Sequence, residues 1–199
     1  MSRMLSDILP EGLSAPPGSE RLEVKGLALD SRTVEPGDLF AALPGVKTDG
    51  RRFIAMAVEK GAVGVLAPPG TEASVPVIEA VDAPGALAAM AARFHPRQPG
   101  TIAAVTGTNG KSSTVEFLRQ IWAHAGHDAA CLGTLGVTRA SGRTQVGYTT
   151  PDAIALHRSL DALAADGVTH LAMEASSHGL KQRRMDGVRV TAAAFTNLS

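Results

Sequence analysis

The residues Thr-Gly-Thr-Asn-Gly-Lys-Ser-Ser at 106–113 constrain the fold more than any other feature of this sequence. They follow the apolar run 102–105 and precede a stretch with helical spacing, 114–125. A strand, a glycine-rich turn with Gly-Lys-Ser and a helix together predict a phosphate-binding loop. The glycines let several backbone N–H groups point at phosphate oxygens, in front of a helix N-terminus. The general pattern has a glycine where this chain has Val105, so the loop is a shorter variant.

The side chains around this loop predict how a nucleotide is held. Lys111 would place its ammonium on the β- and γ-phosphates, and the Ser112 hydroxyl would complete a Mg²⁺ shell. Glu174 ends an apolar strand, where a carboxylate can hold the same ion directly or through water, unless it is a solvated strand-end residue. The predicted ATP-binding residues are Gly107, Thr108, Asn109, Gly110, Lys111, Ser112 and Ser113. Lys111 and Glu174 are the predicted catalytic residues, and Ser112 and Glu174 the predicted metal ligands.

A second polar segment, 176–184, follows the strand that ends at Glu174. Gln182 and Arg184 could clamp a phosphate or a carboxylate by fork-like hydrogen bonds. The alternative for this basic run is a solvated turn, and His178 is expected to be a structural hydrogen-bonding residue rather than an acid or base. The segment is therefore a candidate anion site beside the loop.

Composition narrows the class of protein. The 199 residues are 44% hydrophobic and 19% charged, as in ordinary globular chains. Lys plus Arg and Asp plus Glu number 19 each, so no charge excess indicates a nucleic-acid partner. The single Cys131 excludes an internal disulfide and fits a reducing compartment. Because no targeting segment or membrane-length apolar run is present, we expect a cytoplasmic protein without a membrane partner.

Proline and glycine divide the sequence. The run His-Pro-Arg-Gln-Pro-Gly at 95–100 ends a helix and predicts a linker at 96–100 between domains 1–95 and 101–199. Strand and helix patterns alternate on both sides, which predicts an α/β fold whose second sheet is mainly parallel and covered on both faces. Strands are expected at 26–29, 38–42, 64–67, 75–78, 101–105, 129–132, 169–173 and 190–195. Helices are expected at 53–58, 84–94, 113–125 and 153–165, and the region from 133 to 150 is expected to be irregular.

Several motifs together resemble the Mur ligase family. They are the loop at 106–113, Gly-Thr-Leu-Gly at 133–136, Thr-Thr-Pro-Asp at 149–152, the segment 173–184 and Phe-Thr-Asn-Leu-Ser at 195–199. Asp-Ser-Arg at 30–32, Pro-Gly-Asp-Leu-Phe at 36–40, Asp-Gly at 49–50 and Gly-Ala at 61–62 extend the resemblance to the first half. The chain is most similar to the branch that makes UDP-N-acetylmuramoyl tripeptides. A folylpolyglutamate synthase is disfavoured because it lacks the first-half motifs, and a non-catalytic UDP-sugar- or nucleotide-binding module is the remaining alternative.

The resemblance implies a role for individual residues. Ser31 matches a serine at the uridine end of the substrate, whereas Val46, Lys47 and Thr48 depart from the residues that relatives place against uracil. The residues that match the muramoyl site are Thr149, Thr150 and Asp152. Those that match the set holding the sugar and the carboxylate-bearing arm are Ser176, Gln182 and Arg184.

The resemblance also implies an activity. It is ATP-dependent addition of a third residue, a diamino acid, to UDP-N-acetylmuramoyl-L-alanyl-D-glutamate through an acyl phosphate, with Mg²⁺ as cofactor. Diaminopimelate and lysine both remain open as the third residue, and so does the oligomeric state. Since the chain stops directly after a strand, at 196–199, we expect a fragment. In the family, further metal ligands and a C-terminal domain follow this point, so we expect weak substrate binding and no turnover by these residues alone.

Overall fold

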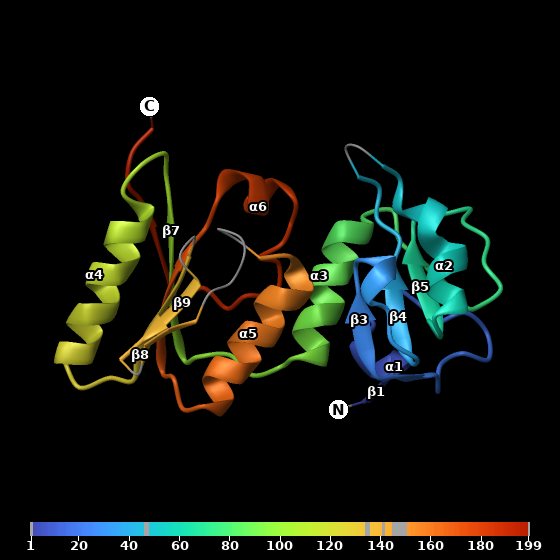
Figure 1. Cartoon of the computed structure of the whole chain (residues 1–199), viewed down its shortest axis with the longest axis horizontal. Helices are drawn as coiled ribbons and strands as arrows, with labels where there is room; N and C mark the ends of the chain where they lie inside the picture. Colours follow the sequence, from blue (N-terminus) through green and yellow to red (C-terminus); the bar gives the residue numbers. More distant parts are fainter. Residues whose placement is uncertain (1, 46–47, 134–135, 141, 145–150, 199) are drawn as a thin grey trace. The chain divides into compact units, whose positions relative to one another are not determined.

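The computed structural model describes residues 2–45, 48–133, 136–140, 142–144 and 151–198 (Figure 1). It divides the chain into two compact units, Met1–Phe94 and His95–Ser199. Each unit has its own sheet and its own hydrophobic core, and the two are described in turn.

The first unit is built on a four-stranded parallel sheet in the order β3-β4-β5-β6. Short 3₁₀ turns and a helix make the first two connections, since parallel neighbours cannot be joined by a tight hairpin. The strands are β3 (Gly26–Ala28), β4 (Asp38–Ala41), β5 (Gly64–Ala67) and β6 (Val77–Glu79). The connecting elements are η1 (Ser31–Thr33), η2 (Gly50–Phe53), α2 (Ile54–Glu59) and, after β6, α3 (Ala83–Phe94).

Strand alternation places this sheet between two apolar layers. Phe40 and Val65 pack in one cluster with Ile54 and Ala57 of α2. Leu66, the neighbour of Val65, is also fully buried and points to the other face, since successive side chains of a strand alternate. Helix α3 contacts β5. Burial on both faces explains why these strands read as continuous apolar runs rather than as alternating patterns.

The first 25 residues contain elements that sequence analysis did not anticipate. Strand β1 (Arg3–Met4) pairs antiparallel with β2 (Glu23–Val24), and α1 (Leu5–Ile8) buries both Leu5 and Ile8 completely. Helix α1 packs against α3. Elements of two to four residues are too short to produce a periodic pattern, so only tertiary contact defines them.

The second unit has a six-stranded sheet in the order β10-β9-β8-β11-β7-β12. Strands β8, β11, β7 and β12 are mutually parallel, which confirms the predicted α/β fold with a mainly parallel sheet. The strands are β7 (Thr101–Thr106), β8 (Ala129–Gly133), β9 (Gly136–Arg139), β10 (Gly142–Thr144), β11 (His170–Glu174) and β12 (Ala192–Phe195). The helices are α4 (Lys111–His124), α5 (Ala153–Ala165) and α6 (Ser177–Lys181).

One expectation about the second unit is wrong. Residues between 133 and 150 were expected to be irregular, but β9 and β10 extend the sheet in antiparallel fashion beyond β8. Pairing of β9 with β8, such as Cys131 opposite Thr138, and of β10 with β9 fixes these short strands. Their three or four residues carry too little alternation for a prediction from the sequence.

Helices α4 and α5 cover opposite faces of this sheet (Figure 1). On β7, Ile102 packs in the same cluster as Leu156 and Leu160 of α5, whereas Val105 packs with Val115 of α4. The two faces follow from the alternation of side chains along the central strands.

The longest described helices are α4 and α5, with 14 and 13 residues. In the part of the chain that the structure describes, no helix has both the length and the apolar character that crossing a bilayer requires.

The segment 96–100, predicted as a linker, is hydrogen bonded to the second unit. The Arg97 backbone N–H and guanidinium both donate to the Asp161 carboxylate on α5, at 2.9 and 2.7 Å. The Gln98 amide donates to Gly187 O at 2.9 Å. These contacts attach the segment to the unit that follows it, so it is not a free connection in this structure.

Candidate active site

The glycine-rich loop lies between β7 and α4, at the carboxyl end of a central strand of the parallel sheet. Gly107 and Gly110 have φ angles of +128° and +84°, which side-chain-bearing residues rarely adopt. A Cβ at Gly107 would also overlap the Thr196 hydroxyl. The two glycines are therefore required by backbone conformation and by close packing.

The two residues that follow β12, Thr196 and Asn197, hold this loop by hydrogen bonds. The Thr196 hydroxyl donates to Asn109 O at 2.6 Å, and Asn197 Oδ1 accepts from Asn109 N at 3.1 Å. Thr108 N donates to Asn197 O at 3.0 Å. Sequence analysis noted the motif at 195–199 but gave no role to Thr196 or Asn197, because only the strand order places β12 beside β7.

The ammonium of Lys111 lies against the loop that it follows. Its Nζ donates to Gly107 O at 2.6 Å and to Thr108 O at 3.0 Å. Lys111 is the first residue of α4, and the preceding Gly110 has no side chain to cap the helix. The first backbone N–H groups of a helix have no intrahelical acceptor, so this end of α4 together with Lys111 forms a cationic, donor-rich position.

Ser112 of α4 and Glu174 of β11 come together beside the loop. The Ser112 hydroxyl donates to Glu174 Oε1 at 2.9 Å. Glu174 ends β11, the neighbour of β7, and is 3% exposed. Gly133 at the end of β8 approaches the same carboxylate so closely that a Cβ there would overlap Oε1. The predicted pair of metal ligands is thus brought together, and Gly133 gives the carboxylate its space.

A small pocket of about 50 Å³ adjoins this pair. Glu116 lies in its lining, and its carboxylate accepts from Arg119 at 2.6 Å, which lowers the pKa of Glu116 to about 2. The lining residues are Ser112, Val115, Glu116, Cys131, Gly133, Gly136, Thr138 and Glu174. Glu116 could not be found from the sequence, because a helical Glu three residues before an Arg is indistinguishable from an ordinary surface pair.

The Cys131 thiol in this pocket is held in its protonated form. It donates to Glu116 Oε2 at 3.2 Å, and burial together with this carboxylate raises the pKa of Cys131 to about 11. A thiol with such a pKa stays protonated near neutrality, and the thiolate is the reactive form. The arrangement agrees with a site that works by charge rather than by covalent attack.

The residues beside the loop fit a magnesium ion. Mg²⁺ takes oxygen ligands and is commonly held by one or two protein groups plus phosphate oxygens and water. The Ser112 hydroxyl and the Glu174 carboxylate are such groups, 2.9 Å apart. No group of three or more His, Cys, Asp or Glu side chains suited to a metal occurs among the described residues. The two oxygens of Ser112 and Glu174 leave the remaining positions of a Mg²⁺ shell to phosphate and water, as for an ion that arrives with a nucleotide.

The basic segment after β11 is organised by its own hydrogen bonds. Ser176 caps α6, its hydroxyl accepting from Gly179 N at 3.0 Å. Arg184 Nε donates to Gln182 Oε1 at 2.8 Å, and Gln182 Nε2 lies 2.8 Å from His178 Nε2. Gln182 and Arg184 are thus brought together, and His178 has the hydrogen-bonding position that was expected of it.

The residues predicted to line the muramoyl site are only partly described. Thr149 and Thr150 lie outside the described residues. Asp152 is the N-cap of α5, where its carboxylate accepts from Ala155 N at 2.8 Å. This contact accounts for the aspartate by helix capping.

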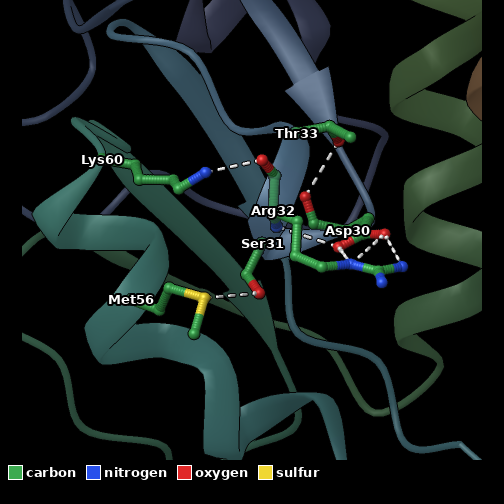
Figure 2. Close-up of polar contacts among 6 residues, drawn as sticks. All are labelled: Asp30, Ser31, Arg32, Thr33, Met56 and Lys60. Carbon is green, nitrogen blue, oxygen red and sulfur yellow. Dashed lines mark hydrogen bonds and ion pairs between the residues drawn. The ribbon is translucent and has the colours of Figure 1, made fainter.

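In the first unit, Ser31 opens the turn η1 directly after β3 (Figure 2). It is 4% exposed, and its hydroxyl donates to Met56 Sδ at 3.4 Å. Flanking contacts fix the turn, since Lys60 Nζ donates to Arg32 O at 2.6 Å and Arg32 pairs with Asp30. The hydrogen bonds from Arg32 lower the pKa of Asp30 to about 2.

The loop after β4 lies at the same edge of the sheet. Val46 and Lys47 are outside the described residues, and Thr48 is exposed. A bridge between Pro44 and Asp49 and a hydrogen bond from Gly50 N to Leu43 O close this loop. Ligands of parallel α/β sheets bind at the carboxyl ends of strands, which is where this loop and Ser31 lie.

Comparison with known proteins agrees with both units. Residues 105–199 match the Mur ligase middle domain, and residues 23–95 match the Mur ligase family catalytic domain. The chain belongs to the Mur ligase family. The two matched ranges together take in most of each compact unit, so the family assignment does not depend on the glycine-rich loop alone.

Individual Mur ligases are similar over nearly the whole chain. The UDP-N-acetylmuramoyl-L-alanyl-D-glutamate–2,6-diaminopimelate ligase of Bradyrhizobium diazoefficiens is 54% identical over 198 residues, which is 98% of this chain and 40% of that protein. The ligase of the same name from Rhizobium meliloti is 56% identical over 180 residues, or 89% of this chain and 37% of that protein. The chain thus spans well under half of the length of these curated relatives.

Solved structures agree with the fold. One UDP-N-acetylmuramoyl-L-alanyl-D-glutamate–2,6-diaminopimelate ligase is 28% identical, with a TM-score of 0.87 over 100% of this chain and 41% of the other. MurF of Thermotoga maritima in complex with ADP is 22% identical, with a TM-score of 0.61 over 87% of this chain and 38% of the other, and shows the fold alone.

Proposed function

We propose that this chain provides the first two parts of an ATP-dependent ligase that adds the third residue to UDP-N-acetylmuramoyl-L-alanyl-D-glutamate. The curated relatives at 54% and 56% identity are named for this substrate and for 2,6-diaminopimelate, which favours diaminopimelate over lysine as the added residue. The proposed reaction is a step of peptidoglycan synthesis. A cytoplasmic location is part of the proposal, because the reaction consumes ATP.

The observation that carries the proposal is the contact between Ser112 and Glu174 beside the loop of Lys111. A hydroxyl at the start of the helix and a carboxylate at the end of the adjacent strand, 2.9 Å apart, form the oxygen pair that a nucleotide-bound Mg²⁺ requires. Bound there, Mg²⁺ would neutralise charge on the transferring phosphoryl group. Ser112 and Glu174 are the residues that would hold it.

The proposed reaction has two steps. The D-Glu carboxylate attacks the γ-phosphorus of ATP, so that an O–P bond forms and ADP leaves with the electrons of the broken bond. The amine of the amino acid then attacks the acyl carbon, an amide bond forms, and phosphate leaves. The intermediate is an acyl phosphate, and no nucleophilic side chain is needed.

Electrostatics indicates which groups of the substrates each residue of this chain would bind. Because a carboxylate must approach a triphosphate, fixed cations near the reacting groups lower the barrier. Lys111 would exchange its two carbonyl acceptors, Gly107 O and Thr108 O, for phosphate oxygens. Arg184 and Gln182 would hold the carboxylate-bearing arm through their planar amide and guanidinium groups.

The first unit would hold the uridine end of the substrate. Ser31 keeps acceptor lone pairs after donating to Met56, so it can still accept from an imide N–H. Parallel-strand ends supply both this turn and the loop 42–50, in agreement with a ligand position at one edge of the sheet.

Calorimetry of the chain tests the proposal. We expect Lys111→Ala to weaken Mg-ATP binding by about tenfold or more, the effect of losing a hydrogen bond to a charged group. Binding of UDP-N-acetylmuramoyl dipeptide should not change, because Ser31 and the segment 176–184 are intact. Lys25→Ala, an exposed lysine of the first unit, is the matched control.

Two results would count against the proposal. If Lys111→Ala leaves ATP affinity equal to that of Lys25→Ala, the phosphate-binding assignment fails. If the unaltered chain binds the UDP ligand but not Mg-ATP, a non-catalytic UDP-sugar-binding module becomes the better description.

A further inference from the structure

The segment 182–189, which carries Gln182 and Arg184, is held by two side chains that have no part in the proposed site. One is His157 of α5, and the other is Gln98 from the stretch before β7. Both reach the main chain of the segment rather than its side chains.

His157 is fully buried, and its ring makes one hydrogen bond. Nε2 lies 2.9 Å from Asp186 O, and a carbonyl oxygen can only accept, so Nε2 carries the proton. Among the described residues, the other ring nitrogen, Nδ1, has no partner. Burial also lowers the pKa of His157, which favours the neutral ring. The single ring proton is therefore directed at the backbone of Asp186.

The turn that Asp186 closes has an unusual backbone. Arg183 has a φ angle of +58° and is the one non-glycine residue with positive φ in the described part of the chain. Its guanidinium donates to Asp186 Oδ2 at 2.6 Å, and Asp186 N donates to Arg183 O at 3.2 Å. Such a backbone persists only when the surroundings determine it.

Packing of Met185 and hydrogen bonds of Gln98 also hold the turn. Met185 is buried in the same cluster as Leu156 and Leu160 of α5. Gln98 Nε2 donates to Gly187 O at 2.9 Å, and Gln98 Oε1 accepts from Arg189 N at 2.9 Å. Residues 185–189 are thus fixed by packing, by His157 and by Gln98.

We propose that His157 is a positioning residue that, by fixing the Asp186 main chain, holds Gln182 and Arg184 in the orientation in which they bind the substrate. Arg184 is two residues from Asp186 and is already hydrogen bonded to Gln182. A shift of the Asp186 backbone would therefore move both side chains together. The inference rests on the proposed function of this segment, and it adds a residue outside the motifs that carry the resemblance.

Two substitutions of His157 separate the effect of its hydrogen bond from the effect of its volume. His157→Gln keeps an amide N–H that can reach Asp186 O, whereas His157→Leu keeps apolar volume without a donor. We expect amide hydrogen exchange at Asp186 and Val188 to rise about tenfold in His157→Leu and to return toward the original rate in His157→Gln, since a buried carbonyl without its donor is costly. Ser159→Ala, whose hydroxyl bonds within α5 to Ala155 O, is the matched control.

Ligand binding supplies the second measurement. Calorimetry should give about tenfold weaker binding of UDP-N-acetylmuramoyl dipeptide to His157→Leu, with Mg-ATP affinity unchanged, because the phosphate-binding loop lies on other elements. His157→Gln should restore affinity for the UDP ligand. If His157→Leu does not fold, Gln98→Ala tests the same segment from its exposed side and should give the same pattern.

The outcomes are distinguishable. Unchanged exchange at Asp186 in a folded His157→Leu chain would overturn the inference, and so would faster exchange with unchanged affinity for the UDP ligand. Failure of the unaltered chain to bind that ligand would overturn the proposed function and the binding part of this inference. The exchange rates would then still decide whether His157 fixes the turn.

Discussion

At the scale of single residues, charge and space around Glu174 decide what the site can do. A buried carboxylate needs hydrogen-bond donors or a cation, and Ser112 supplies one donor at 2.9 Å. Gly133 donates nothing to the carboxylate, but it leaves the space that the carboxylate occupies, because a Cβ there would overlap Glu174 Oε1. The motif 133–136 could be recognised in the sequence, but the glycine's reason for being there could not.

Gly133→Ala should therefore damage the site without touching any polar group. The added methyl overlaps Glu174 Oε1, so we expect loss of about 1–3 kcal/mol of stability or displacement of the carboxylate from Ser112. Urea unfolding and Mg-ATP calorimetry measure the two effects. Gly100→Ala is the control, since its Cβ would meet only Thr169 O at 3.9 Å. Equal behaviour of the two variants would contradict this account.

His157 predicts a pH dependence of stability. Burial lowers its pKa below the usual 6.5, so the unfolded chain takes up a proton at a pH where the folded chain does not. Stability is then full above the usual pKa and falls as the pH falls through it toward the lowered folded value. The free energy of unfolding, measured between about pH 8 and pH 5, should fall more steeply in the original chain than in His157→Gln. Parallel curves would disprove the assignment.

At the scale of elements, a few polar contacts decide which unit a connecting segment belongs to. The stretch 96–100 has the proline and glycine content of a linker, and such a composition predicts no partner. In the structure its Arg97 and Gln98 bond to α5 and to the segment after α6. The sequence could place the boundary between the two units, but it could not show which unit the residues 96–100 would bind.

The pair of Arg97 and Asp161 gives a test at this scale. Asp161 is buried, and the hydrogen bonds from Arg97 lower its pKa. We expect Asp161→Asn to reduce the free energy of unfolding by about 1–2 kcal/mol, because a charge-assisted bidentate contact is lost. Asp166→Asn, which removes an exposed partner of Arg139 from the end of the same helix, should cost less than about 0.5 kcal/mol. Urea unfolding of both variants decides the point, and equal losses would refute it.

At the scale of the whole molecule, the two units carry different parts of the proposed reaction. The first matches the family over 23–95 and holds Ser31, and the second matches over 105–199 and holds Lys111 and Glu174. The curated relatives extend far beyond the aligned residues, since the chain spans 40% of one and 37% of another.

We therefore expect the 199-residue polypeptide by itself to give no ADP release that depends on both the UDP dipeptide and diaminopimelate. A coupled ADP assay measures this, with the full-length Bradyrhizobium diazoefficiens ligase as positive control. Release of ADP that requires both substrates would show that the chain alone contains a complete site.

The sequence by itself determined the class of fold, the position of the glycine-rich loop and the family, because strand-loop-helix patterns and short motifs are local. Lys111, Ser112 and the strand ending at Glu174 could be found in this way. The tertiary structure decided the contacts made across the sheet: Thr196 and Asn197 against the loop, Gly133 against Glu174, and His157 against Asp186. Their partners are 29 to 90 residues away along the chain, and strand order and packing alone set which of them meet.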